Sequence, residues 1–225
     1  MKASAEAKMS PSKYGGQEFA STYNVSRETI GRLQIYHDLL IKWQKAINLV
    51  SPKTLGEIWF RHFADSAQVS DHIPKNSSVA DLGSGAGFPG LVLAIMRPDL
   101  EIHLIESDLR KSEFLKNVSR ETKSTVKVYN DRVEKILGAG VMPAIITARA
   151  FAPLTEILEM IPENCRAAQL ILLKGRMALE EAEEARKTHQ FDMIDIASRT
   201  DPEGKILKIS FRSQSIPSRG NFLTP

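Results

Sequence analysis

Strand-like and helix-like segments alternate along most of this 225-residue chain. Short apolar runs are separated by stretches in which apolar residues recur at helical spacing. The apolar runs occupy residues 79–82, 102–105, 126–129, 144–148 and 170–173, and the helical stretches occupy residues 91–96, 109–120, 153–161 and 177–189. Because a helical stretch follows four of these five strands, the pattern predicts βαβ units, which build a parallel sheet with helices on both faces.

The last two apolar runs differ from the others. Residues 193–197 and 206–211 are strand-like, but only a Thr-Asp-Pro-Glu-Gly turn at residues 200–204 interrupts them. Two strands joined without a helix should pair antiparallel, as a hairpin. The chain is therefore predicted to be an α/β protein with a Rossmann-like, mostly parallel sheet of seven strands that ends in an antiparallel hairpin.

The residues before the first strand predict a helical segment. From Ser26, a suitable N-cap, apolar residues recur in steps of three and four up to Ile47. Thr54 and Glu57 form a capping-box pair that opens a second helix, which should end near Val69. The small, polar and aperiodic residues before position 26 predict a loose arm. We therefore expect a flexible N-terminal arm (1–25), a helical cap (26–73), an α/β domain (74–212) and a C-terminal tail (213–225).

Composition excludes several classes of protein. Hydrophobic residues make up 42% of the chain and charged residues 25%, as in ordinary globular proteins, so disorder and collagen-like structure are excluded. The single cysteine, Cys165, cannot form an internal disulfide, and no apolar run is long enough to span a bilayer. The N-terminus shows no secretory signal, so we expect a cytoplasmic protein without membrane contact, and a monomer is favoured.

The net charge of +3 is unevenly distributed. Residues 1–62 hold nine basic and five acidic residues, and residues 203–225 hold four and one, so the segment between them, with 17 and 21, is acidic. Basic ends around an acidic centre are compatible with binding a polyanion. On this evidence alone, however, ordinary solvated surface charge is the favoured explanation.

The strongest chemical signal directly follows the first strand. Residues 81–90 read Asp-Leu-Gly-Ser-Gly-Ala-Gly-Phe-Pro-Gly. Glycine lets the backbone turn sharply and approach a ligand without a Cβ in the way. The carboxyl edge of a parallel sheet is also where α/β folds bind ligands. The loop therefore predicts a cofactor site at this edge.

Two cofactors fit such a loop. The glycines at 85, 87 and 90 match the dinucleotide fingerprint, and Glu106 lies 21 residues after Gly85, near the spacing of about 20 expected for a ribose-binding acid. That fingerprint should open the turn itself, however, and here it starts three residues after the strand. The spacing of Asp81, Gly83, Gly85 and Gly87 starts inside the strand and favours S-adenosylmethionine, whose amino group Asp81 can face directly or through water. Glu106, ending the second strand, is then placed to accept from both ribose hydroxyls.

The segment after the fourth strand bears on the methyl acceptor. Residues 147–153 read Thr-Ala-Arg-Ala-Phe-Ala-Pro and lack the Asn/Asp-Pro-Pro-aromatic motif common in amino methylases. Cys165 has no histidine beside it, which favours a small packed residue over a nucleophile for ring-carbon methylation. No general base is evident. This is compatible with an acceptor that has a free lone pair, such as guanine N7, because positioning then supplies most of the catalysis.

Taken in order along the chain, several short motifs resemble one known family. They are Asn48-Leu49-Val50-Ser51, Arg61-His62 with Asp65-Ser66, the glycine loop, Glu106 with Lys111, Phe114 and Leu115, Arg132-Val133-Glu134, Arg149-Ala150-Phe151-Ala152 and Leu173-Lys174-Gly175. Over about residues 30–210 the chain is similar to the RsmG family, also called GidB. The resemblance implies a bacterial enzyme that uses S-adenosylmethionine to methylate guanine N7 in the decoding-region loop of 16S rRNA. Its partner would be 16S rRNA or the small ribosomal subunit, and residues 74–212 would be its seven-stranded methyltransferase domain.

The resemblance also implies roles for individual residues. Gly83 and Phe88 would contact the cofactor, Val133 and Glu134 would flank its adenine, and Arg149 would be a further cofactor-site residue. Arg149 and Lys174 are candidates for a catalytic role, and Arg61, His62 and Lys174 are candidates for binding RNA. Simpler explanations remain: Arg61 could pair with Asp65 four residues on, and His62 could merely pack. A small-molecule methyltransferase, an NAD-dependent oxidoreductase and a non-enzymatic rRNA-binding protein remain alternatives, and no metal is expected.

Overall fold

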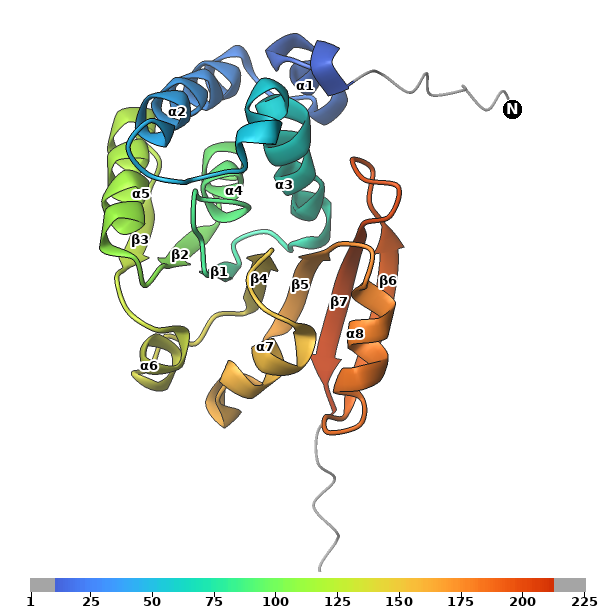
Figure 1. Cartoon of the computed structure of the whole chain (residues 1–225). Coiled ribbons are helices and arrows are strands. Elements are labelled where there is room, and N and C mark those ends of the chain that lie inside the picture. Colours follow the sequence, from blue (N-terminus) through green and yellow to red (C-terminus); the bar gives the residue numbers. More distant parts are fainter. Residues whose placement is uncertain (1–10, 213–225) are drawn as a thin grey trace, which may run out of the picture.

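Seven strands form one sheet in a computed structural model, which describes residues 11–212 (Figure 1). The order across the sheet is β3-β2-β1-β4-β5-β7-β6. The first five strands pair parallel, and β7 pairs antiparallel with both β5 and β6. The strands are β1 (Ser78–Leu82), β2 (Glu101–Ile105), β3 (Val126–Tyr129), β4 (Ile145–Arg149), β5 (Gln169–Lys174), β6 (Phe191–Ala197) and β7 (Lys205–Phe211). The predicted parallel sheet with a C-terminal antiparallel hairpin is confirmed.

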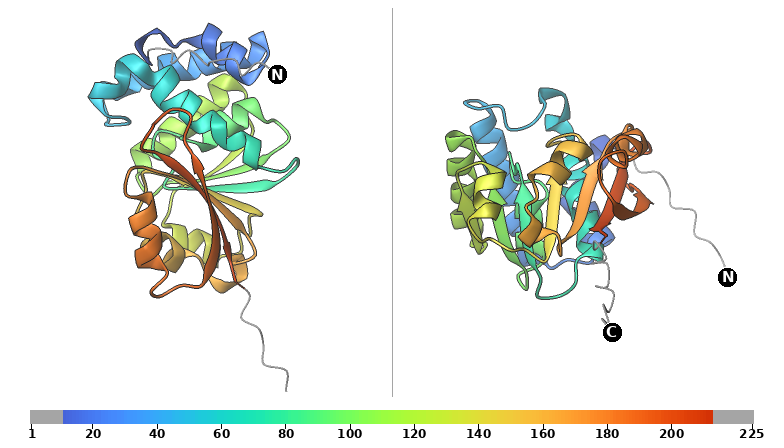
Figure 2. Two further views of the ribbon diagram at one scale, coloured as in Figure 1. Left: turned by 90° about the vertical axis from the view of Figure 1, so that its right-hand side faces the viewer. Right: turned by 90° about the horizontal axis from the view of Figure 1, so that it is seen from below.

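Helices cover both faces of this sheet (Figure 2). One face packs against α4 (Gly90–Met96), α5 (Leu109–Thr122) and the N-terminal cap, and the other against α6 (Val133–Gly138), α7 (Leu154–Met160) and α8 (Ala178–Ala185). Neighbouring strand residues such as Val79 and Ala80 belong to different buried clusters, because successive side chains point to opposite faces. Burial on both faces explains why the strands read as continuous apolar runs rather than as alternating ones.

The cap begins with the expected long helix. In α2 (Arg27–Gln44) the Ser26 hydroxyl accepts a hydrogen bond from the Thr29 N–H, as predicted for an N-cap. The single second helix expected from residue 54 is replaced by consecutive helical turns of different pitch. These are the 3-10 helix η2 (Pro52–Glu57), the π-helical η3 (Trp59–Ala64), α3 (Asp65–Ala67) and the 3-10 helix η4 (Gln68–His72).

The structure differs from the prediction of a loose arm before residue 26. Residues 11–25 contain the 3-10 helix η1 (Pro11–Lys13) and the helix α1 (Gly16–Tyr23), which belong to the cap. Phe19 is fully buried, with its ring centroid 4.7 Å from that of Tyr23 and 5.7 Å from that of Trp59. The sparse aromatic residues that anchor this segment gave too weak a periodicity to predict it. Residues 1–10 of the predicted arm and the tail at 213–225 lie outside the described residues.

The burial of Phe19 makes the docking of α1 testable. We expect Phe19→Ala to lower the free energy of unfolding by about 3–5 kcal/mol, because it removes a whole ring from the core and leaves a cavity. Urea titration followed by circular dichroism measures this. Gln17→Ala, an exposed position of the same helix, is the control and should change stability by less than about 0.5 kcal/mol. Equal effects of the two substitutions would contradict the packing of α1.

Candidate active site

The glycine loop connects β1 to α4 at the carboxyl edge of the sheet. Gly83, Gly85 and Gly87 have φ angles of +60°, +55° and +96°, which residues with a side chain rarely adopt. A Cβ at Gly83 would lie 2.1 Å from the Phe151 ring, whereas the nearest atom to a Cβ at Gly85 would be the Gly83 carbonyl oxygen, 3.7 Å away. The space beside Gly85 is thus nearly empty, and a bare backbone there can receive a ligand at close range.

Asp81 lies beneath this loop and is fully buried. Its Oδ1 accepts from the Thr147 hydroxyl of β4 at 3.0 Å, and its Oδ2 accepts from the Gly90 N–H at the start of α4 at 3.2 Å. Burial raises the pKa of this carboxyl to about 7. Asp81 therefore ties β1 to β4 and fixes where α4 begins. Contact between Asp81 and the amino group of a cofactor stays a prediction.

Glu106 follows β2 and lies against the same loop. Its Oε2 accepts from the Gly85 N–H and its Oε1 from the Asp108 N–H, both at 2.8 Å. Val133, at the start of α6, is buried in the same cluster as Ile105, the neighbour of Glu106, while Glu134 is exposed. The predicted ribose- and adenine-binding residues thus follow β2 and β3, next to each other at the edge where the glycine loop lies.

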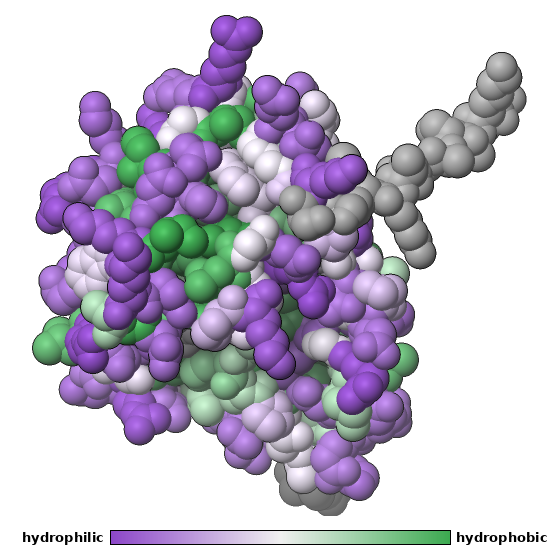
Figure 3. All heavy atoms as spheres, turned by 45° about the horizontal axis from the view of Figure 1, so that its top comes forward, coloured by the Kyte–Doolittle hydropathy of each residue, from purple (hydrophilic) through white to green (hydrophobic). Residues whose placement is uncertain are grey.

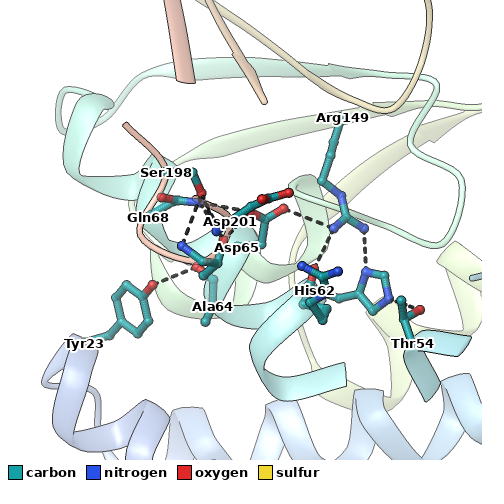
Figure 4. Close-up of polar contacts among 11 residues, drawn as sticks. Tyr23, Thr54, His62, Ala64, Asp65, Gln68, Arg149, Ser198 and Asp201 are labelled. Atoms are coloured by element: carbon teal, nitrogen blue, oxygen red, sulfur yellow. Dashed lines mark hydrogen bonds and ion pairs between the residues drawn. The ribbon is translucent and has the colours of Figure 1, made fainter. Parts of the chain in front are cut away.

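Arg149 ends β4 and links it to the cap (Figure 4). Its Nη1 donates to the Arg61 carbonyl oxygen at 3.1 Å and to Asp65 Oδ2 at 3.2 Å, and its Nη2 donates to His62 Nδ1 at 2.9 Å. The guanidinium also lies over the Phe88 ring, 4.7 Å from its centroid. Three residues predicted from the sequence, Arg149, His62 and Phe88, are therefore in direct contact.

His62 is held in one neutral form by its neighbours. Burial, with Arg149 and Arg61 nearby, lowers its pKa to about 3. An arginine can only donate, so His62 Nδ1 must be the acceptor and Nε2 carries the hydrogen. Nε2–H then donates to the Thr54 hydroxyl at 2.9 Å, which donates to the Ser51 carbonyl oxygen at 2.9 Å. His62 thus positions the cap, and at neutral pH it carries no charge for an RNA phosphate.

Asp65 extends the contacts of Arg149 to the C-terminal hairpin. The Asp65 Oδ1 accepts from the Thr200 hydroxyl at 2.6 Å and from Gln68 Nε2 at 2.9 Å. Gln68 Nε2 also donates to the Ser198 hydroxyl at 3.1 Å. The cap, β4 and the β6–β7 turn therefore meet in one polar network (Figure 4). The Arg61–Asp65 pair considered from the sequence is absent in the described structure: Asp65 pairs with Arg149, and the exposed Arg61 Nε lies 3.7 Å from Glu57.

A cleft of about 680 Å³ opens beside this network. Residues 49–51 of the cap, residues 149–153 after β4, residues 173–175 after β5 and the β6–β7 turn line it. Lys174 is held at its wall: Nζ donates to the Ala152 carbonyl oxygen at 2.6 Å and pairs with Glu181 at 2.7 Å, leaving the side chain 9% exposed. The cleft is of a size that suits a nucleobase or nucleotide.

Sequence reasoning missed several residues of this site. Thr147 faces Asp81 across the β1–β4 pair, Glu181 holds Lys174 from α8, and Gln68 joins the cap to the hairpin. In the chain, Thr147 lies 66 residues from Asp81, Glu181 lies 7 residues from Lys174, and Gln68 lies 130 residues from its partner Ser198. Only the i,i+7 spacing of Lys174 and Glu181 is local enough to suggest a contact. Within residues 11–212 no group of three or more potential metal ligands occurs.

His62 and Asp81 predict opposite effects of pH on stability. Unfolded histidine binds a proton near pH 6.5, but folded His62 does not until about pH 3, so its contribution to stability is lost as the pH falls below 6.5. Folded Asp81 keeps its proton up to about pH 7, whereas the unfolded residue releases it near pH 4, so its contribution is lost as the pH rises from 4 to 7.

Substitution separates the two effects. Between pH 4.5 and 6.5, His62→Gln should gain stability relative to wild type as the pH falls, and Asp81→Asn should gain as it rises, each by roughly 1–3 kcal/mol. Urea titrations at several pH values measure the differences. Curves for both variants that run parallel to the wild-type curve would contradict the protonation states assigned here.

Solved structures show which class of protein has this fold. The chain is similar to magnesium protoporphyrin IX methyltransferase from Synechocystis PCC 6803, a structure with bound S-adenosylmethionine, with a TM-score of 0.56 and 13% identity over 84% of this chain and 98% of that one. Sheet order, glycine loop and this likeness define the Rossmann-like methyltransferase class.

None of the helices among residues 11–212 is both long and apolar enough to cross a membrane.

Within that class, the chain belongs to the GidB family, rRNA small subunit methyltransferase G, which matches residues 29–204. Relatives with the name ribosomal RNA small subunit methyltransferase G include one from Paramagnetospirillum magneticum, 43% identical over 198 residues (87% of this chain, 95% of the relative). Another, from Rhodospirillum rubrum, is 46% identical over 196 residues (86% and 96%). The family expected from the motifs, the methyltransferase activity and S-adenosylmethionine as methyl donor are confirmed, which excludes the NAD-dependent oxidoreductase.

Proposed function

We propose that this protein transfers a methyl group from S-adenosylmethionine to N7 of a guanine in the decoding-region loop of bacterial 16S rRNA. The names of its relatives specify RNA of the small ribosomal subunit, which supports the RNA substrate. The choice of acceptor atom rests on the chemistry of the cleft. Its histidine is neutral with both ring nitrogens engaged, Asp65 and Glu181 are each paired with a cation, and the third carboxylate, Asp201, accepts from the Glu203 N–H in its own turn.

The described residues fit the methyl donor. The bare backbone at Gly85 leaves room for a ligand, and Glu106 offers carboxylate oxygens to ribose hydroxyls beside it. Val133 supplies an apolar wall for the adenine. When bound, S-adenosylmethionine supplies a methyl group on a sulfonium, which the acceptor's lone pair takes while the electrons of the C–S bond return to sulfur.

Guanine N7 suits this cleft because it carries no hydrogen. Its lone pair lies in the ring plane and is available at neutral pH, so no residue has to remove a proton before transfer. The work of the protein is then to hold the base in line with the methyl group and to exclude water, a contribution that can reach several kcal/mol. The network of Arg149, Asp65 and His62 provides a rigid wall for that purpose.

RNA phosphates add an electrostatic contribution. Lys45, Arg110 and Lys111 line a second pocket between the end of α2 and the start of α5, together with Asp108, and their side-chain nitrogens form no ion pair with a carboxylate among residues 11–212. The face drawn in Figure 3 is largely hydrophilic around a smaller hydrophobic area, which suits a hydrated polyanion. We propose that the enzyme acts in the cytoplasm, as a monomer, on 16S rRNA or the small subunit.

Contacts with RNA phosphates make affinity depend on salt. Between 50 and 200 mM salt we expect the dissociation constant for small ribosomal subunits to rise at least about tenfold, because each phosphate contact releases counterions. Filter binding of labelled subunits measures this, with S-adenosylmethionine binding at the same salt concentrations as the control. An RNA affinity that stays flat over this range would contradict the proposed electrostatic contribution.

Labelled methyl transfer tests the substrate class. The protein is offered S-adenosylmethionine with a labelled methyl group together with small subunits, naked 16S rRNA or total metabolites. We expect label in the RNA fractions only. Label in a metabolite would show a small-molecule methyltransferase, and RNA binding without label would show that this RNA is not the methyl acceptor. Either result would overturn the proposal.

A further inference from the structure

Phe151 lies between the glycine loop and the cleft. The Cδ2 and Cε2 edge of its ring would be 2.1 and 2.6 Å from a Cβ at Gly83, so the ring lies directly on that glycine. Phe151 also lines the cleft, which Gly83, Gly85 and Gly87 do not. Whatever occupies the cleft next to the loop must therefore meet this ring.

The backbone before Phe151 accounts for its position. Ala150 has a φ of +49°, in the left-handed region that residues with a Cβ seldom occupy. This turn comes directly after Arg149, whose side chain is fixed to the cap, and it sends the following residue toward the glycine loop. A non-glycine residue held in this conformation is typical of functional sites, where the surrounding contacts impose it.

The loop that carries Phe151 is fixed on its other side as well. Lys174 Nζ donates to the Ala152 carbonyl oxygen at 2.6 Å, and Glu181 Oε2 accepts from the Leu154 N–H at 2.9 Å. Lys174 and Glu181 in turn pair at 2.7 Å. Residues 149–154 are therefore held by Arg149 at one end and by this pair at the other, which leaves the ring little freedom to move.

The ring of Phe151 is available for stacking. Phe88, the phenylalanine of the glycine loop, is covered by the rings of Tyr36 and His62, with centroid distances of 5.5 and 5.0 Å. No described aromatic ring stacks on Phe151, and its side chain is only half-buried at the wall of the cleft. Enzymes that modify a nucleobase hold it by stacking on aromatic or apolar side chains.

We propose that Phe151 is the residue on which the acceptor guanine stacks, and that Glu181 is a positioning residue that holds Phe151 through the 149–154 loop. This inference rests on the proposed function. Stacking on a ring that touches Gly83 brings the base against the glycine loop, where the methyl donor is expected to lie. A purine offers a large ring face for this contact, whereas its N7 edge stays free for the methyl group.

Substitutions at Phe151 test the stacking. Phe151→Leu should lower kcat/KM for small subunits by about 5- to 150-fold, the range expected for loss of one base-stacking contact. Phe151→Tyr, which keeps the ring, should stay within about threefold of wild type. The dissociation constant for S-adenosylmethionine, measured by calorimetry, should change less than threefold in both. Phe211→Leu is the matched control and should leave kcat/KM unchanged. Phe211 is also half-buried, but it ends the antiparallel strand β7 and so lies at the edge of the sheet opposite the carboxyl ends of the parallel strands.

Two results would overturn the inference. Wild-type activity of Phe151→Leu would show that apolar packing suffices, and an equal loss in cofactor affinity would assign the ring to the cofactor site.

Substitutions at Glu181 test its positioning role. Glu181→Gln should retain more activity than Glu181→Ala, because the amide oxygen still accepts from Leu154. Phe151→Leu should then lower kcat/KM by a smaller factor in the Glu181→Ala background than in the wild-type protein. Strictly additive effects of the two substitutions would contradict the positioning role of Glu181. Failure of the wild-type protein to methylate subunits would instead reject the proposed function.

Discussion

Replacing Arg149 with alanine is expected to abolish methyl transfer. The substitution leaves the Asp65 carboxylate, which is 18% exposed, without its ion pair and His62 Nδ1 without a donor, and it separates β4 from the cap. Loss of one partner of a fully buried pair costs about 3–5 kcal/mol, and this pair is partly buried, so we expect a somewhat smaller loss of stability together with loss of the cleft geometry. Labelled methyl transfer to small subunits, with thermal unfolding of the same samples, measures both effects.

Arg199→Ala is the matched control for this change. Arg199 pairs with Asp71 at 2.7 Å and also joins the hairpin to the cap, but the two side chains are 57% and 46% exposed. Exposed pairs contribute about 0–1 kcal/mol, so this variant should keep its activity and nearly all of its stability. Arg149→Lys keeps the charge but cannot reach three acceptors, and it should fall between wild type and alanine. Full activity of Arg149→Ala would show that Arg149 is not part of the active site.

Asp81→Ala should have an effect of similar size for a different reason. Without the carboxylate, the buried Thr147 hydroxyl and the Gly90 N–H lose their acceptor, at a cost of roughly 1–3 kcal/mol each. The glycine loop and the start of α4 would no longer be fixed relative to β4. We therefore expect no detectable methyl transfer and a large loss of S-adenosylmethionine affinity, measured by calorimetry on protein shown to be folded by circular dichroism.

Thr147→Val distinguishes the role of the Thr147–Asp81 hydrogen bond from the role of the contact between Asp81 and the glycine loop. It removes one of the two donors to Asp81 but leaves the Gly90 contact, so cofactor affinity should fall by no more than about tenfold. If Asp81→Ala and Thr147→Val behaved alike, Asp81 would serve only the β1–β4 contact. Undiminished methyl transfer in both Arg149→Ala and Asp81→Ala would remove the site assignment altogether.

Much of the fold follows from local patterns in the sequence. Strands buried on both faces are continuous apolar runs, and the Ser26 cap and the glycines of residues 83–90 carry their own conformational preferences. Segments with weak local signals were missed. The helix α6 has only six residues, and α1 is anchored by a few aromatic side chains rather than by a regular apolar stripe.

The candidate site was predictable in its residue types but not in its contacts. The glycine loop and Glu106 could be named because they follow strands at one edge of the sheet, and Arg149 because the family resemblance implies it. The pairing of Arg149 with Asp65 joins residues 84 positions apart, and that of Asp65 with Thr200 joins residues 135 apart. Such contacts depend on how the cap and the hairpin pack on the sheet, which no local pattern encodes. The cofactor and RNA roles of the individual residues stay predictions.

Mapping the methylated atom tests the central claim most directly. Small ribosomal subunits from cells lacking the enzyme are treated with the protein and S-adenosylmethionine, and the 16S rRNA is then cleaved chemically at N7-methylguanine. We predict one new cleavage, at a guanine of the decoding-region loop, that is absent without the protein and with Arg149→Ala. Methylation that gives no cleavage at guanine, or cleavage only elsewhere in the RNA, would contradict the account.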